Sequence, residues 1–192
     1  MKKFLSIILS LAMLLALAAC GNVSEETAEE APAPEAEQEE TIDPLEAART
    51  TDQLLYQAVL DAEGCMNTMY EKIKALQSGG TPEDVIAHCN DAVLICSDAR
   101  RLMQTIPEKE HSKEYVKQAE SYIMNVEAAN ISARDVFQNS NMEASERMNR
   151  CLQEHLALTQ VMVSARIDYL YAVGLPEEEI QSILGVEPEA EG

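Results

Sequence analysis

The segment from Leu45 to Leu76, LEAARTTDQLLYQAVLDAEGCMNTMYEKIKAL, decides the fold. Apolar or small residues recur along it in alternating steps of three and four. The stripe comprises Leu45, Ala48, Asp52, Leu55, Val59, Ala62, Met66, Met69, Ile73 and Leu76, in which only Asp52 is polar. A repeat of about 3.5 residues is typical of a helix that packs along its length against other helices. The segment therefore predicts a long amphipathic helix and an all-α fold.

Proline and glycine divide the rest of the domain into further helical segments with the same spacing. Asp43 and Pro44 open the first helix, Thr81 opens the second, and Ser140 with Glu143 can form a capping box at the fourth. The predicted helices cover residues 44–78, 82–105, 108 or 112 to 139, and 141–174, with a short fifth helix over 176–184. The further stripes are Val85, Cys89, Ala92, Cys96, Ala99, Met103 and Ile106; Tyr115, Ala119, Tyr122, Val126, Ala129, Ala133 and Val136; and Ala144, Met148, Cys151, His155, Leu158, Met162, Ala165, Tyr169 and Ala172.

Short links between long helices favour antiparallel neighbours that cross at about 20°. We therefore expect residues 44–185 to form an up-down-up-down four-helix bundle with a short C-terminal fifth helix. That helix carries Ile180 and Ile183, and we expect it to cover the start of the first helix. Residues 186–192 form an acidic tail.

The N-terminus carries an export signal. Lys2 and Lys3 precede an apolar stretch that is too short for a good membrane-spanning helix and ends in Leu17-Ala18-Ala19-Cys20 before Gly21. This ending resembles the lipobox of bacterial lipoproteins. The resemblance implies that residues 1–19 are removed and that Cys20 is lipidated, which would hold the protein at the extracytoplasmic face of a bacterial cell membrane. An ordinary cleaved signal peptide and an uncleaved anchor helix are the alternatives.

The chain is strongly acidic, with a formal net charge of −20. Without Lys2 and Lys3, 12 basic residues face 34 acidic ones, a net charge of −22. Residues 20–43 contain nine of these acids and almost no large apolar side chain, so we expect a disordered acidic linker. Because the domain has no basic stripe or aromatic platform, nucleic acid is not an expected partner.

Four cysteines lie in the predicted domain: Cys65, Cys89, Cys96 and Cys151. They form no CxxC motif or zinc-like cluster, and free cysteine commonly packs as a small apolar residue. When the first two helices are paired about their turn, Cys65 falls opposite residues 94–96. A disulfide between Cys65 and Cys96 is therefore an alternative to two buried thiols in an exported protein.

The same pairing places Met69, Cys89, Cys151 and His155 near one layer of the interior. Cys151 and His155 are four residues apart, on one helical face. Sulfur with imidazole suits copper(I), and Met with His can ligate haem. The set is loosely similar to that of the haem-binding four-helix cytochromes, but it lies at another end of the bundle and lacks other haem motifs. Ordinary core packing is the competing interpretation, and it implies no cofactor.

No motif predicts catalysis. Glu108-Lys109-Glu110-His111 contains the Glu-x-x-His element of di-iron bundles, but only once and in a turn. We therefore expect a binding, sensory or structural module rather than an enzyme. The fold is similar to the helical ligand-binding domains of bacterial chemoreceptors, whose spanning helices and cytoplasmic part are not in this sequence. Any signal would then pass through another surface or membrane protein.

Overall fold

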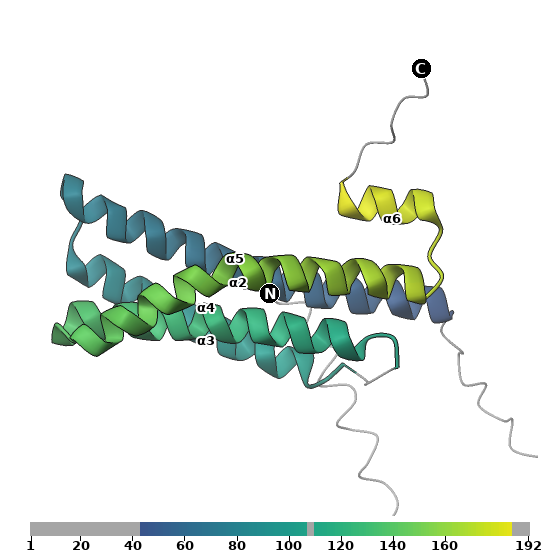
Figure 1. Cartoon of the computed structure of the whole chain (residues 1–192), viewed down its shortest axis with the longest axis horizontal. Helices are drawn as coiled ribbons and strands as arrows, with labels where there is room; N and C mark the ends of the chain where they lie inside the picture. Colours follow the sequence, from purple (N-terminus) through teal and green to yellow (C-terminus); the bar gives the residue numbers. More distant parts are fainter. Residues whose placement is uncertain (1–42, 107–109, 186–192) are drawn as a thin grey trace, which may run out of the picture. The chain divides into compact units, whose positions relative to one another are not determined.

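The computed structural model describes residues 43–106 and 110–185, and these ranges are helical without any strand. The helices are α2 (Pro44–Ala75), which continues into the 3-10 turn η1 (Leu76–Ser78), α3 (Pro82–Met103), α4 (Lys113–Asn139), α5 (Met142–Ala172) and α6 (Glu177–Leu184) (Figure 1). The all-α prediction is confirmed. Within the described ranges no helix has the length and apolarity needed to cross a bilayer. Cys20, the expected signal peptide, nearly all of the expected linker and the acidic tail lie outside these ranges.

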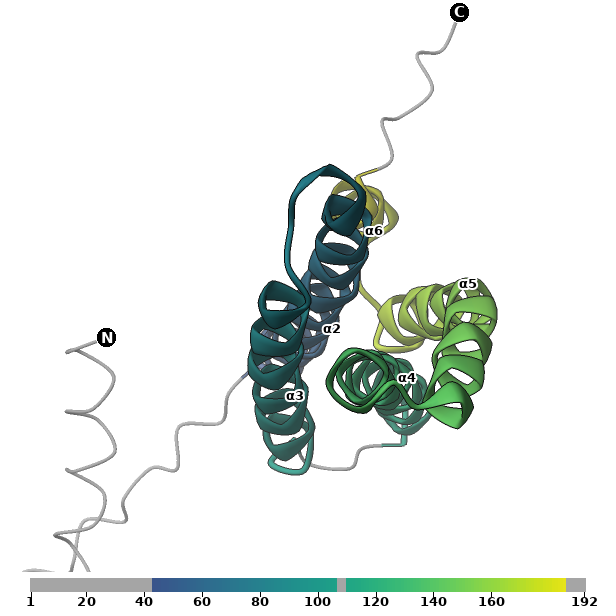
Figure 2. The same ribbon diagram turned by 90° about the vertical axis from the view of Figure 1, so that its left-hand side faces the viewer.

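The long helices pack mainly against their neighbours in the chain. α2 packs on α3, α3 on α4 and α4 on α5, and α2 also contacts α4 more extensively than it contacts α5. The turned view in Figure 2 shows α2 and α3 as one pair and α4 and α5 as another. The interior lies between these pairs.

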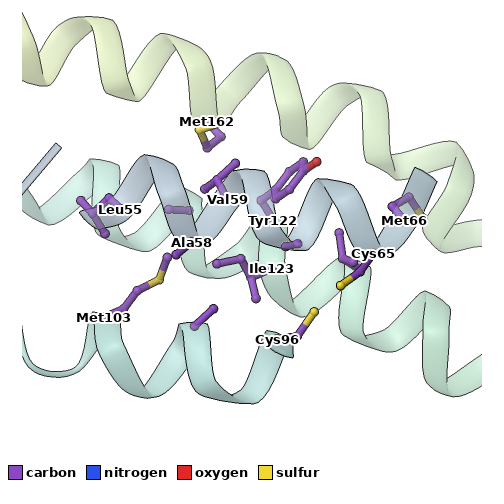
Figure 3. Close-up of a cluster of buried hydrophobic side chains, with 14 of the residues drawn as sticks. Leu55, Ala58, Val59, Cys65, Met66, Cys96, Met103, Tyr122, Ile123 and Met162 are labelled. Atoms are coloured by element: carbon purple, nitrogen blue, oxygen red, sulfur yellow. The ribbon is translucent and has the colours of Figure 1, made fainter. Parts of the chain in front are cut away.

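Most stripe residues predicted from the 3.5-residue spacing are buried. Every predicted position from Val85 to Ile106 is buried, and Leu55, Met66 and Met69 of α2 have 0% exposure. Figure 3 shows part of this core, with side chains from α2, α3, α4 and α5. The spacing therefore identifies the inward faces of α2, α3 and α4 well.

The prediction is less accurate for α5. Met148, Cys151, His155 and Leu158 are only partly buried, and Ala172 is exposed. Hydrogen bonds between α2 and α5 join Ala48 and Asp52 to the C-terminal half of α5. The N-terminal half of α5 thus has less cover from α2, and its stripe is closer to solvent.

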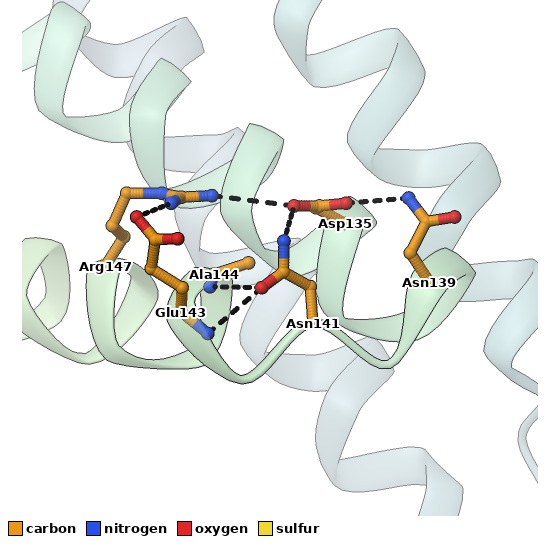
Figure 4. A network of polar contacts seen from close by, with 6 residues as sticks. All are labelled: Asp135, Asn139, Asn141, Glu143, Ala144 and Arg147. Atoms are coloured by element: carbon orange, nitrogen blue, oxygen red, sulfur yellow. Dashed lines mark hydrogen bonds and ion pairs between the residues drawn. The ribbon is translucent and has the colours of Figure 1, made fainter.

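The helix starts confirm two predicted caps, Asp43 at α2 and Thr81 at α3, and correct a third. Thr81 and Asp84 form a reciprocal capping box at α3, as expected. Ser140, however, is the left-handed residue that ends α4, with φ 54°, so the predicted box with Glu143 is wrong. Asn141 caps α5, because its side-chain oxygen accepts hydrogen bonds from the backbone N–H groups of Glu143 and Ala144 (Figure 4).

The short helix α6 returns toward the start of α2. Leu175, just before it, and Ile180, within it, are buried. Glu179 of α6 pairs with Arg49 of α2. This position agrees with the prediction that the short fifth helix covers the start of the first helix. The helix α6 also forms one wall of a cavity.

Candidate functional site

A buried ion pair joins α2 to α5. Arg166 donates from Nε to Oδ1 of Asp52 and from Nη2 to Oδ2, both at 2.8 Å. Asp52 is 3% exposed and Arg166 is 5% exposed. Two parallel charge-assisted hydrogen bonds are a strong arrangement, and they satisfy both oxygens of the carboxylate. Burial opposes the charge of Arg166, but the hydrogen bonds and the attraction of Asp52 outweigh it and raise the arginine pKa.

Aromatic side chains surround this pair. The Arg166 guanidinium carbon lies 3.4 Å from the centre of the Tyr56 ring, in cation–π contact. Tyr115 and Tyr169 have ring centroids 5.6 Å apart, and the Tyr169 hydroxyl donates to the carbonyl oxygen of Ala48 at 3.1 Å. Burial, with a smaller effect from the negative charge of Asp52, raises the pKa of Tyr115. Tyrosine side chains thus cover part of the pair.

A cavity of about 570 Å³ opens beside the ion pair, between α2, α5 and α6. Its volume falls in the range of small-molecule sites. The lining combines four charged groups with amide, hydroxyl and apolar side chains: Arg49, Thr50, Asp52, Gln53, Leu54, Tyr56, Gln57, Arg166, Glu179 and Ile183. We define these residues as the α2–α5–α6 cavity.

A second ion pair stands at the edge of this cavity. Arg49 donates from Nε to Glu179 at 2.5 Å and from Nη2 at 2.9 Å. Both side chains are about one-third exposed, at 37% and 30%. Arg49, which is the more exposed of the two arginines, uses Nε and Nη2 for Glu179, and its Nη1 makes no hydrogen bond to the described residues. The cavity can therefore offer a guanidinium donor together with a carboxylate acceptor.

Three of the residues proposed for a copper or haem layer are not grouped as metal ligands. The described residues contain no group of three or more His, Cys, Asp or Glu side chains that could hold a metal ion, so Cys89, Cys151 and His155 do not form one. His155 instead faces Tyr122, with ring centroids 5.1 Å apart. Met69 and Cys89 are fully buried core residues, and burial raises the pKa of Cys89 to about 11.

His155 lies in a mainly apolar setting. Its Nδ1 is buried and has no hydrogen-bond partner. Burial lowers its pKa, and the charge of Glu63 offsets part of that effect. A neutral imidazole packed on an aromatic ring is consistent with a role in the interior of the fold.

The two cysteines considered for a disulfide do meet. Cys65 of α2 and Cys96 of α3 are free thiols, both buried, and Figure 3 shows their sulfur atoms directed toward each other. The predicted juxtaposition of the two residues is therefore present.

Sequence reasoning missed the α2–α5–α6 cavity. Asp52 stood out as the polar residue in an apolar stripe, but its partner Arg166 lies one position beyond the predicted core residue Ala165. A buried carboxylate needs a partner, so a search for an arginine next to another stripe could have found it. Comparisons with models of known protein families, with curated proteins and with solved structures found no match for this chain.

Proposed function

We propose that this protein is a lipid-anchored extracytoplasmic binding module built on an antiparallel up-down-up-down four-helix bundle. Its site is the α2–α5–α6 cavity, and its ligand is a small zwitterion of the amino-acid type. The observation that carries the proposal is the pairing of Arg49 with Glu179 at the edge of a cavity whose floor holds a second, buried ion pair.

The charges of the cavity favour a ligand that carries both signs. Two arginines and two carboxylates line it, and their formal charges cancel. A ligand carboxylate can accept from the Nη1 group of Arg49, and a ligand ammonium can donate to Glu179. Because both residues are held in place by each other before a ligand arrives, little side-chain entropy is lost on binding.

The buried Asp52–Arg166 pair provides a scaffold for the same site. Asp52 and Arg166 are buried and mutually bonded, so they keep α2 and α5 in register beneath the cavity. Sites built on rigid helices hold their geometry better than sites on loops. The short turns and the packing of consecutive helices support the proposed bundle topology.

Isothermal titration calorimetry with each of the twenty common L-amino acids tests the binding role. The protein is purified from membranes in detergent, and we expect at least one amino acid to bind with one-to-one stoichiometry. Arg49→Gln should weaken that binding about tenfold to a hundredfold, because it removes the charged donor proposed to face the ligand carboxylate.

Arg101→Gln is the matched control, since Arg101 is an exposed arginine of α3 that pairs with Asp98 and does not line the cavity. Its affinity should equal that of the unmodified protein. Absence of binding by all twenty amino acids, or equal binding by Arg49→Gln, would refute the proposed site.

The alternative function, a copper- or haem-binding redox bundle, finds no favourable observation in the described residues. Metal analysis and a visible absorption spectrum of the same preparation distinguish the two functions. Stoichiometric copper or haem would replace the small-molecule proposal with the redox one.

A further inference from the structure

Cys65 and Cys96 form a buried thiol pair across the α2–α3 interface. Cys65 is 4% exposed and Cys96 is 0% exposed. In Figure 3 the two side chains extend from facing helices, with their sulfur atoms directed toward each other. Neither residue belongs to the α2–α5–α6 cavity.

A hydrogen bond links the two helices at this level. The Nε2 atom of His88, on α3, lies 2.9 Å from the backbone oxygen of Cys65, on α2. The contact joins the backbone of Cys65 to α3, the helix that carries Cys96. The juxtaposition of the thiols therefore does not depend on side-chain rotamers alone.

The two thiols also differ in acidity. A hydrogen bond from the Cys96 thiol lowers the pKa of Cys65, although burial acts in the opposite direction. The same hydrogen bond, followed by burial, raises the pKa of Cys96. Since the thiolate is the attacking species in thiol–disulfide exchange, Cys65 is the better nucleophile of the pair.

We propose that Cys65 and Cys96 are joined by a disulfide that cross-links α2 to α3 in the mature protein. The oxidant is an external disulfide, either of a thiol oxidoreductase or of glutathione. The Cys65 thiolate attacks one of its sulfurs and displaces the first thiolate. Cys96 then loses its proton and attacks the Cys65 sulfur, which displaces the second. Two protein S–H bonds are replaced by one S–S bond, and the external disulfide is reduced to two thiols.

Oxidation occurs during folding, once α2 and α3 have paired and before the rest of the domain covers the two thiols. In the cell it depends on the proposed extracytoplasmic location, where such oxidants persist. The pairing itself depends only on the α2–α3 geometry. A cross-link between residues 65 and 96 encloses the α2–α3 turn and restricts the unfolded chain.

Peptide mapping after oxidative refolding tests the proposal. The full chain carrying Cys20→Ser, which removes the one cysteine outside the described residues, is refolded with oxidised and reduced glutathione. Free thiols are then alkylated, and the protein is cut with trypsin and an Asp-specific protease. This digestion separates the peptides 61–72, 84–90, 91–97 and 151–166, each of which contains one cysteine. We expect 61–72 and 91–97 to be recovered as a linked species that separates on reduction.

Two further measurements complete the test. Reduction should lower the melting temperature of the refolded protein by about 5–10 °C, and it should not change that of Cys96→Ala. Cys89→Ala is the matched control on the same helix, and it should retain the linked species. Amino-acid binding at the α2–α5–α6 cavity does not require the link, so failure of one proposal is distinguishable from failure of the other.

Alkylation of both Cys65 and Cys96 after refolding of the otherwise unmodified chain would overturn the proposal. A link from either residue to Cys89 or Cys151 would overturn it as well. The peptide map of this chain decides the question even where an alanine variant does not fold.

Discussion

Asp52 shows how one residue can belong to the core pattern without being apolar. It occupies a position in the buried stripe of α2, where an unpaired carboxylate would lose its hydration without gaining a hydrogen bond or a counter-charge. Arg166 supplies two hydrogen bonds and an opposite charge, and Tyr56 covers the guanidinium. The interaction thus depends on both charged partners being present, which makes it sensitive to single substitutions.

Asp52→Ala should therefore destabilise the fold severely. Removal of one partner leaves Arg166 buried without its counter-charge, which costs about 3–5 kcal/mol. Urea denaturation followed by circular dichroism measures the loss. The double variant Asp52→Leu with Arg166→Met should recover most of it, because an apolar pair of similar size carries no charge to desolvate.

Asp98→Ala provides the comparison at an exposed ion pair. Asp98 and Arg101 are each 72% exposed, so we expect a change of less than about 1 kcal/mol. If Asp52→Ala were no more destabilising than Asp98→Ala, the buried pair would not stabilise the α2–α5 contact.

At the scale of the elements, the α4–α5 turn is built by two adjacent residues with different roles. Ser140 adopts a left-handed conformation and ends α4, while Asn141 begins α5. Asn141 also donates from Nδ2 to Oδ2 of Asp135 at 2.7 Å, and Arg147 pairs with the same carboxylate (Figure 4). The turn is therefore held by a cap and by a polar network behind it.

Substitutions in this turn should have opposite effects on stability. Asn141→Ala removes the cap of α5 and should cost about 1 kcal/mol. Ser140→Gly relieves a left-handed conformation that is unfavourable for residues with a Cβ atom, and it should stabilise the fold by up to about 1 kcal/mol. Thermal and urea denaturation of both variants provide the measurement. The reverse order would show that Ser140, as predicted from the capping-box pattern, is the true cap.

At the scale of the whole molecule, the proposed anchor and the proposed binding site have separate roles. In these proposals the lipobox-like ending at Cys20 attaches the protein to the membrane, and the α2–α5–α6 cavity binds the ligand. The net charge of −20 belongs to the chain as a whole and favours solubility rather than a particular fold. A change at Cys20 should thus alter where the protein is found without altering its helices.

Cys20→Ser should release the protein from the membrane fraction while leaving its circular dichroism spectrum unchanged. The reason is that acyl chains on the mature N-terminus would be the attachment, and a serine cannot form the thioether. Fractionation followed by immunoblotting measures the release, and mass spectrometry of the N-terminus identifies the lipid. Cys151→Ser is the control and should remain with the membranes. An unmodified N-terminal Cys20 in the unaltered protein would contradict the anchoring proposal.

The helices and their inward faces were largely predictable from the sequence. Caps, prolines, glycines and the 3.5-residue spacing act over a few residues, so the chain itself determined the start of α3 at Thr81 and the stripes of α2 and α3. The same local patterns misplaced the cap at Ser140, since Ser140 and Asn141 are both good capping residues and the local pattern does not distinguish them.

Which side chains meet was decided only by the tertiary structure. Asp52 and Arg166 are 114 residues apart in the chain, and Arg49 and Glu179 are 130 apart. Their contacts depend on the register and rotation of whole helices, which result from the summed packing of many buried residues rather than from any local signal. For the same reason the sequence could place Cys65 near Cys96 across one short turn, whereas its grouping of Cys89 on α3 with Cys151 and His155 on α5 is not found in the described residues.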